Sequence, residues 1–255
     1  MFLLNGARGV LALAALCTGL LLAGCAAPSA APGHRQTESQ AATRAARGPS
    51  GTSAPTLQVR QIPGLGPVTR SAIPTTTRQA LVVTGEGRDS SRSTVVLYED
   101  KPAGAWQPVT GRWQAHNARR GWTYEHNASD LRTPIGVFTL GDAGGRLPDP
   151  GTRLPYDEDN GFVSPGTGFL GEPLEGSFDY VVAIDYNRTP GTTPLDKTRP
   201  LGLGKGGGVW VHVDHEGPTQ ACVSLPRQQM IELLLLLDPA KRPVIMMGDT
   251  KALRR

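Results

Sequence analysis

Short runs of β-branched and aromatic residues recur along the chain from residue 81 onward. Residues 81–84 and 94–98 are two such runs, separated by a turn rich in Gly, Ser and Asp. This pattern predicts two neighbouring strands joined by a turn. Further strands are predicted by similar patterns elsewhere. They fall at residues 136–140, 180–186, 209–213 and 244–247.

One segment, residues 227–237, has the signals of a helix. It has Ser224 as its expected N-cap and Pro226 in its first turn, and it stops before an Asp-Pro pair. Residues 141–176 are rich in Gly and Pro, which predicts long loops with little regular structure. Short strands, Gly/Pro-rich turns and a single helix predict a mainly β sandwich with one covering helix, in one folded domain at residues 57–251.

The N-terminal segment has the composition of a secretory signal. Residues 1–24 contain one basic residue and no acidic residue, and an apolar run extends from residue 10 to residue 23. The run is too short for a comfortable membrane span. Its end, Leu-Ala-Gly-Cys at 22–25, resembles the lipobox of bacterial lipoprotein precursors, which implies a lipid on Cys25. The alternatives are an ordinary secreted protein in which Cys25 has no such role, or a retained anchor helix.

Residues 25–56 are expected to form a disordered tether, because they contain almost no apolar side chain larger than alanine. The lipid would hold the domain at the outer face of the cytoplasmic membrane, facing the cell wall. The net charge of +4 is mild, and the basic residues are scattered. Nucleic-acid binding is therefore not expected.

Cysteine usage points to a reactive thiol. Of three cysteines, Cys17 lies in the predicted signal and Cys25 would carry the lipid. Cys222 is then the only free thiol of an exported protein, and no disulfide within one chain is possible. A lone cysteine outside the membrane has little structural reason to be there, so we take Cys222 as a candidate nucleophile.

A histidine stands near this cysteine in a predicted strand. Valines at alternate positions of residues 209–213 predict a core face, so His212 points away from the core with Asp214 beside it. Cys222 follows His212 by ten positions. An adjacent imidazole can take the thiol proton, and backbone N–H groups around Cys222 would hold an oxyanion, with Ala221 leaving room. The alternative is a buried, inert cysteine near a surface histidine.

These residues resemble the active-site signature of the L,D-transpeptidase (YkuD-type) family. That signature is a strand-borne histidine followed by Ser/Thr-x-Gly-Cys-Val/Ile ahead of a helix. His212 matches the histidine, and residues 219–223 match the cysteine motif. Upstream, residues 130–138 resemble the family's Thr-Pro-x-Gly-x-Phe stretch, and residues 185–187 resemble a further shared element. The likeness covers roughly residues 81–248.

The resemblance implies a cysteine-dependent acyltransferase that acts on peptidoglycan and needs no metal or other cofactor. Cys222, activated by His212, would attack the carbonyl of the third residue of a tetrapeptide stem. The terminal D-alanine would leave, and the thioester would pass to an amine. Members of the family are typically acylated by carbapenems at this cysteine. The implied partners are peptidoglycan stem peptides and, through the lipid, the membrane.

Further residues belong to the predicted substrate and oxyanion region. Arg188 could bind a stem-peptide carboxylate with both arms of its guanidinium, or be a solvated loop residue. Asp214 could orient His212 as the third member of a triad, although a strand-end acid is the preferred interpretation. His215 is expected to be a solvated loop residue or a substrate-side donor, facing away from His212 and forming no metal site with it. The region comprises Thr219, Gln220, Ala221, Asp214, His215, Tyr186 and Arg188.

Three positions depart from the family's pattern. Gln220 and Ala221 replace the His-Gly pair of many members, and glycine can adopt backbone geometries that alanine resists. Ser224 replaces the usual Arg or Asn, which puts a substrate contact at that position in question. Two alternatives therefore stay open: a degenerate relative that binds wall peptide without turnover, and an L,D-carboxypeptidase that uses water as acceptor.

Overall fold

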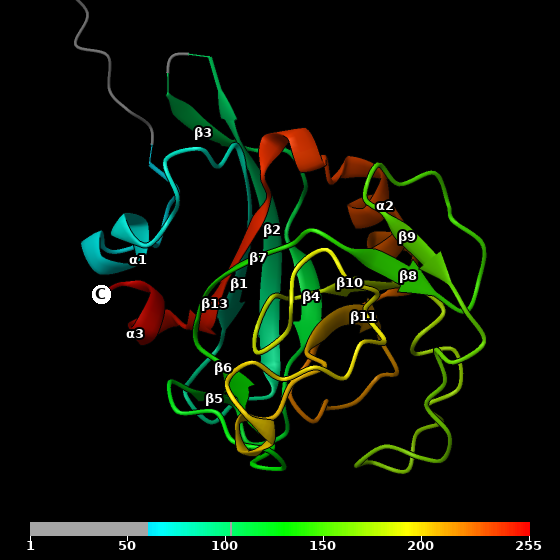
Figure 1. The fold of residues 1–255 in the computed structure, drawn as a ribbon. Helices are drawn as coiled ribbons and strands as arrows, with labels where there is room; N and C mark the ends of the chain where they lie inside the picture. Colours follow the sequence, from blue (N-terminus) through cyan, green and yellow to red (C-terminus); the bar gives the residue numbers. More distant parts are fainter. Residues whose placement is uncertain (1–60, 103) are drawn as a thin grey trace, which may run out of the picture. The chain divides into compact units, whose positions relative to one another are not determined.

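The computed structural model describes residues 61–102 and 104–255, and this part of the chain is mainly β (Figure 1). The predicted signal peptide, the lipidation at Cys25 and the tether lie outside the described residues. Within the described ranges, no helix is long and apolar enough to cross a membrane.

The main sheet is one continuous, curled, mixed sheet rather than a sandwich of two sheets. Its two arms meet where β12 pairs with β4 on one side and with β11 on the other, and Ser224 opposite His116 joins the arms. The sandwich prediction is thus corrected to a half-barrel, because β12 keeps the two arms hydrogen-bonded to each other. The strand order is β7 (Gly136–Thr139), β13 (Val244–Asp249), β1 (Gln79–Gly85), β2 (Arg92–Lys101), β4 (Trp113–His116), β12 (Val223–Leu225), β11 (Trp210–Val213), β10 (Val181–Ala183), β8 (Ala143–Gly145) and β9 (Tyr156–Glu158), with β3 (Ala105–Pro108) paired to β2.

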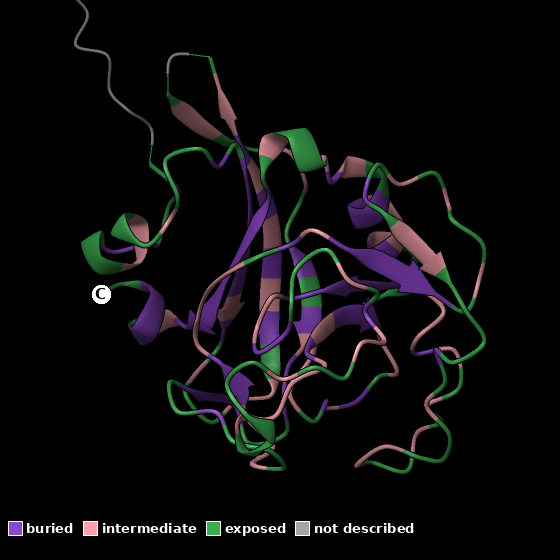
Figure 2. Ribbon diagram, viewed as in Figure 1, coloured by how far each residue is buried: buried purple, intermediate pink, exposed green. Residues whose placement is uncertain are grey.

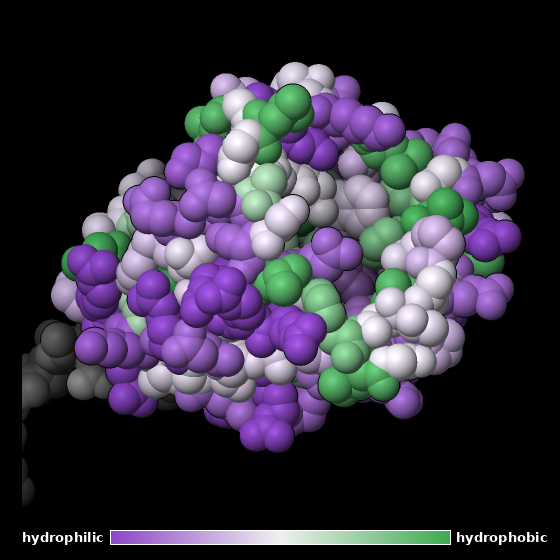
Figure 3. Space-filling view, turned by 90° about the horizontal axis from the view of Figure 1, so that it is seen from below, coloured by the Kyte–Doolittle hydropathy of each residue, from purple (hydrophilic) through white to green (hydrophobic). Residues whose placement is uncertain are grey.

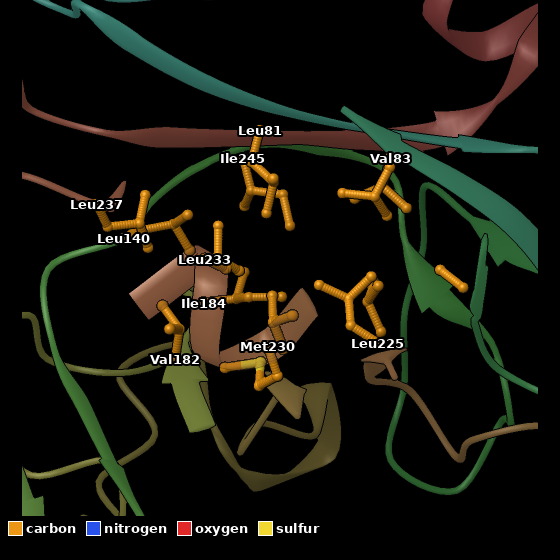
Figure 4. Close-up of a cluster of buried hydrophobic side chains, with 14 of the residues drawn as sticks. Leu81, Val83, Leu140, Val182, Ile184, Leu225, Met230, Leu233, Leu237 and Ile245 are labelled. Atoms are coloured by element: carbon orange, nitrogen blue, oxygen red, sulfur yellow. The ribbon is translucent and has the colours of Figure 1, made fainter. Parts of the chain in front are cut away.

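The main core fills the space inside the curl. Helix α2 (Arg227–Leu236) packs there, with Met230 and Leu233 fully buried against the two arms. Figure 4 shows Leu81 and Ile245 from β1 and β13 above this helix, on which Leu233 and Met230 lie. Apolar side chains that the sequence places far apart therefore share one core, and their burial is the main stabilising contribution to the fold.

A second, smaller core lies on the outer face of β1 and β13. The alternate residues Ala80 and Val82 of β1 pack there beneath Leu253 of α3 (Thr250–Leu253). Figure 1 shows α1 (Pro67–Ser71) beside α3, and Figure 2 shows β1 and β13 buried along their length. Gly66 N–H donates to the carbonyl of Leu253 at 2.8 Å, so the folded unit continues beyond residue 251.

The strands predicted from β-branched runs all occur, with ends shifted by up to a few residues. The predicted helix is α2, but its N-cap position is occupied by Pro226 without a side-chain cap. Ser224 lies in β12 instead, where it pairs with His212 and His116, and its hydroxyl donates to Asp214. The predicted long-loop segment contains two short strands, β8 and β9, whose pairing depends on the sheet edge rather than on a local pattern. The remaining short elements are β5 (Trp122–Thr123), β6 (Thr133–Pro134), η1 (Leu203–Lys205) and η2 (Pro239–Lys241).

Candidate active site

Two parallel neighbouring strands carry the candidate nucleophile and base. Val211 of β11 lies opposite Val223 of β12, and Cys222 immediately precedes β12. The alternation predicted for β11 is confirmed: Val211 and Val213 are buried in the main core, whereas Trp210 and His212 lie on the opposite face. Strand pairing therefore brings His212 and Cys222 to one side of the sheet.

Both side chains line a cavity of about 570 Å³. Its walls come from β11, from the loop at residues 218–222 and from two long loops, residues 164–178 and 194–208. Figure 3 shows the lower face of the molecule hollowed, with apolar and weakly polar residues beside the hollow. The volume lies in the range typical of small-molecule and peptide sites.

The Cys222 thiol is held by backbone groups. The Trp210 N–H donates to the sulfur at 3.4 Å, and the thiol donates to the carbonyl of Gly208 at 3.7 Å. Neither contact involves His212. Burial raises the pKa of the Cys222 thiol to about 11, so the resting cysteine is protonated at neutral pH.

His212 is fixed from two sides. Its Nδ1 lies 2.9 Å from the carbonyl oxygen of Val213, which can only accept, so Nδ1 carries the proton. The ring of Phe178 meets the imidazole edge-on at a centroid distance of 5.3 Å. Burial lowers the pKa of His212 to about 4, so the ring is neutral and Nε2 is the nitrogen without a proton.

The turn that presents Cys222 is anchored by two threonines. Thr219 Oγ1 donates to the carbonyl of Cys222 at 2.7 Å, and Thr133 Oγ1 lies 3.5 Å from the same oxygen. Thr133 itself accepts from the N–H of Ala118 at 2.9 Å. The upstream segment 130–138 therefore reaches the site by holding the backbone of the cysteine turn.

The segment at residues 185–187 supports the loop that forms one wall of the cavity but does not itself line the cavity. Asn187 Nδ2 donates to the carbonyls of Gly202 and Gly206 at 3.0 and 2.6 Å. The hydroxyl of Tyr186 donates to the carbonyl of Lys205 at 2.9 Å. Tyr186 is not among the cavity-lining residues, so its predicted place in the substrate region is corrected to a support for the loop at residues 194–208.

Arg188 is not available to a substrate carboxylate. It is 6% exposed and donates to Asp142 Oδ2 at 2.8 Å, to Asp185, and to the carbonyl of Thr192 at 2.7 Å. Both the substrate-binding and the solvated-loop expectations are wrong, because two buried carboxylates need this cation as their partner.

Asp214 lies at the seam between the two arms of the sheet. Its Oδ1 is 2.9 Å from Nδ1 of His116 and also accepts from the hydroxyl of Ser224. Burial raises the pKa of Asp214, but these two hydrogen bonds outweigh it and hold the pKa below its usual value. Asp214 thus neither lines the cavity nor orients His212. The fully buried Ser224 is likewise unable to contact a substrate.

His215 lies on the same side as His212, contrary to the expectation from strand alternation. The chain leaves β11 after Val213, and the two imidazole rings stack at 5.8 Å with an interplanar angle of 10°. His215 lines the cavity, and its Nδ1 is 3.2 Å from Glu172 Oε1. Within residues 61–102 and 104–255, no group of three His, Cys, Asp or Glu side chains is placed to hold a metal ion.

Gln220 and Ala221 line the cavity beside the thiol, as predicted for the region around Cys222. Five non-glycine residues of the described chain have a left-handed backbone, and Ala221 is not one of them. Alanine at this position is therefore free of the strain that the departure from glycine suggested. The oxyanion role of the backbone N–H groups around Cys222 stays a prediction.

Sequence reasoning missed two cations of the cavity wall. Lys197 and Arg199 lie on the loop at residues 194–208, and Arg199 Nη1 donates to the carbonyls of Asp196 and Thr198. Its guanidinium lies near Gly207 and Gly208, and the three glycines at 206–208 all have positive φ. The run of three glycines at 206–208 was the available signal, because such a run allows close approach of another group.

Comparison with known proteins adds no relative. No protein-family model matches the chain, and no curated protein matches it. The resemblance to the L,D-transpeptidase family therefore stays a prediction from the sequence motifs.

Proposed function

We propose that this protein is a cysteine acyltransferase of the L,D-transpeptidase type that acts on peptidoglycan stem peptides. One observation carries the proposal: Cys222 and a neutral His212 line the same cavity, whose volume is about 570 Å³. The two upstream motif segments support it as well. Residues 130–138 hold the turn that carries Cys222, and residues 185–187 hold the cavity-lining loop at residues 194–208.

The first half-reaction transfers an acyl group to sulfur. The thiol turns from the Gly208 carbonyl and gives its proton to His212 Nε2 while the sulfur attacks the donor carbonyl. The C–N bond then breaks, and the leaving amine takes the proton from His212. Because the pKa of His212 is about 4 and that of Cys222 about 11, the two groups begin uncharged, and the proton moves during attack.

The second half-reaction regenerates the thiol. An acceptor attacks the thioester carbonyl, the C–S bond breaks, and the sulfur recovers its proton by way of His212. An amine acceptor gives transpeptidation, and water gives an L,D-carboxypeptidase. The proposed site of action is the outer face of the cytoplasmic membrane, with a lipid on Cys25 as anchor.

A second candidate function is favoured by the state of the thiol. Its hydrogen-bond partners are the backbone of Trp210 and Gly208, not His212, and burial raises its pKa. If the thiol keeps these backbone hydrogen bonds when substrate is bound, the protein would bind wall peptide without turnover.

Formation of an acyl-enzyme would distinguish the acyltransferase from the binding protein. We expect a carbapenem to add its mass stoichiometrically to the full chain, as seen by intact-mass spectrometry, and peptide mapping to place the adduct on Cys222. A tetrapeptide donor should likewise release D-alanine. No adduct, on protein whose Cys222 is reduced and open to a small alkylating reagent, would exclude the acyltransferase and leave the binding function.

Arg199 is expected to bind the terminal carboxylate of the donor, because it lines the cavity and its guanidinium lies near Gly208, whose carbonyl accepts from the thiol. Charge-assisted hydrogen bonds contribute about 1.5–3 kcal/mol, so Arg199→Gln should lower kcat/KM for a tetrapeptide acid by about 10–100-fold. The exposed Arg146 offers a matched control outside the cavity, and Arg146→Gln should change little.

A tetrapeptide amide makes this prediction specific. It lacks the carboxylate, so wild type should use it as poorly as Arg199→Gln uses the acid. The variant should discriminate little between acid and amide. Equal losses on both substrates in Arg199→Gln would mean that the arginine only supports the loop.

A further inference from the structure

A second imidazole faces the cavity and has no role in the half-reactions above. The ring of His215 stacks on that of His212 at 5.8 Å, so the two are within reach of one bound substrate. The side chain of His215 is 6% exposed, yet it contributes to the cavity lining. It is therefore largely buried and open toward the site rather than toward bulk solvent.

A carboxylate fixes this second imidazole. Glu172 Oε1 lies 3.2 Å from Nδ1 of His215, and Glu172 Oε2 accepts from the N–H of Leu170 at 2.7 Å. Burial raises the pKa of Glu172, but the backbone donors and His215 outweigh it and hold the pKa below its usual value. An ionised Glu172 keeps the proton on Nδ1, so Nε2 of His215 is left as a base.

The loop at residues 164–178 and the turn after β11 both leave room for this carboxylate. A Cβ atom added at Gly168 or at Gly217 would overlap the carboxylate of Glu172, so both positions leave room for it. The arrangement repeats that of His212, in which a backbone carbonyl, rather than a carboxylate, holds Nδ1. Two imidazoles of similar orientation thus line the cavity that also contains the thiol.

An amine acceptor gives up two protons, which two bases at the site can take. A primary amine reaches the site mostly as an ammonium ion at neutral pH. It loses one proton before it can attack and a second after the new C–N bond has formed. His212 passes one proton to the departing sulfur, and its own burial prevents it from holding another. The other proton needs a separate acceptor.

We propose that His215, held by Glu172, is the base that deprotonates the acceptor ammonium in the amine-transfer half-reaction. This inference rests on the proposed function. The ammonium gives a proton to His215 Nε2, and the free amine attacks the thioester. The C–S bond breaks, the second proton reaches sulfur through His212, and His215 releases its proton to solvent. Thioester and ammonium give amide, thiol and one proton.

The test is the fate of the acyl-enzyme. The enzyme is incubated with a tetrapeptide donor and increasing amounts of a stem tripeptide that carries one free side-chain amine. Mass spectrometry then measures the ratio of amide product to hydrolysed donor. We expect His215→Gln and Glu172→Gln to lower this ratio at least tenfold, and both to retain acyl-enzyme formation.

Matched variants separate this role from a structural one. Glu175 is exposed on the same loop as Glu172, and His116 pairs with Asp214 outside the cavity. Glu175→Gln and His116→Gln should keep the wild-type ratio. A purely structural role of His215 would slow transfer and hydrolysis together and leave the ratio unchanged, which would overturn the inference.

Two other results are equally decisive. If the wild-type protein forms an acyl-enzyme but yields only hydrolysed donor, transfer to an amine is refuted, whereas the proposal of a nucleophilic Cys222 still holds. Wild type that forms no acyl-enzyme at all would instead refute the proposed function, and the inference with it.

Discussion

Acylation by a carbapenem should cease in Cys222→Ala and slow by about 10²–10⁴-fold in His212→Gln, the range typical of losing a general base. The alanine variant lacks the sulfur. The glutamine variant keeps a side chain of similar size but cannot take the thiol proton, and the pKa of about 11 leaves little thiolate at pH 7. Stopped-flow or intact-mass kinetics would measure both rates, with His116→Gln as a histidine control outside the cavity.

The pH dependence sharpens this prediction. The active form of His212 is the neutral one, so the rate of acylation should fall as pH falls through about 4, not through the ordinary histidine value near 6.5. In His212→Gln this acid limb should vanish. Its residual rate should instead rise about tenfold per pH unit toward pH 11, as the thiolate forms. Equal rates for His212→Gln and wild type at pH 7 would show that His212 is not the base.

Replacing Arg188 with leucine should lower the free energy of unfolding by about 3–5 kcal/mol, because two buried carboxylates then lose their cation. Arg188 is 6% exposed and bonds Asp142 and Asp185 at once. The matched control is Arg153→Leu. Arg153 pairs with Asp238 at 2.8 Å, but its side chain is 60% exposed, so solvent screening should keep its loss to about 1 kcal/mol or less.

Urea unfolding followed by circular dichroism would measure both variants. Burial raises the pKa of Asp185, so the loss in Arg188→Leu should shrink as the pH is lowered and protonation removes the unpaired charge of Asp185. If Arg188→Leu instead unfolds like Arg153→Leu but loses donor affinity, the arginine serves a substrate after all.

Local sequence patterns were sufficient where one strand or one helix decided the outcome. The alternation of valines in residues 209–213 correctly placed His212 on the face opposite the core, because side chains of a strand point to alternate sides. The continuous apolar runs of β1 and β13 and the leucine-rich helix were also recognised. Each of these signals depends on neighbours in the chain, so no long-range contact was needed to interpret it.

The errors concern contacts between segments that lie far apart in the sequence. His215 was expected to face away from His212, but β11 ends at Val213 and the following turn brings the two rings together. The sequence suggests that Arg188 binds a substrate carboxylate, but Arg188 instead pairs with Asp142, which lies 46 residues away in the sequence. The pairing of β12 with both β4 and β11 likewise turned an expected sandwich into one curled sheet.

The sequence by itself determined the mainly β class, the covering helix, and the candidate pair of Cys222 and His212. Only the tertiary structure decided which groups share the cavity, because the positions of Glu172, Arg199 and the threonine anchors follow from loop packing. It also decided the state of the pair. Burial depends on all surrounding segments at once, and it is burial that lowers the pKa of His212 and raises that of Cys222.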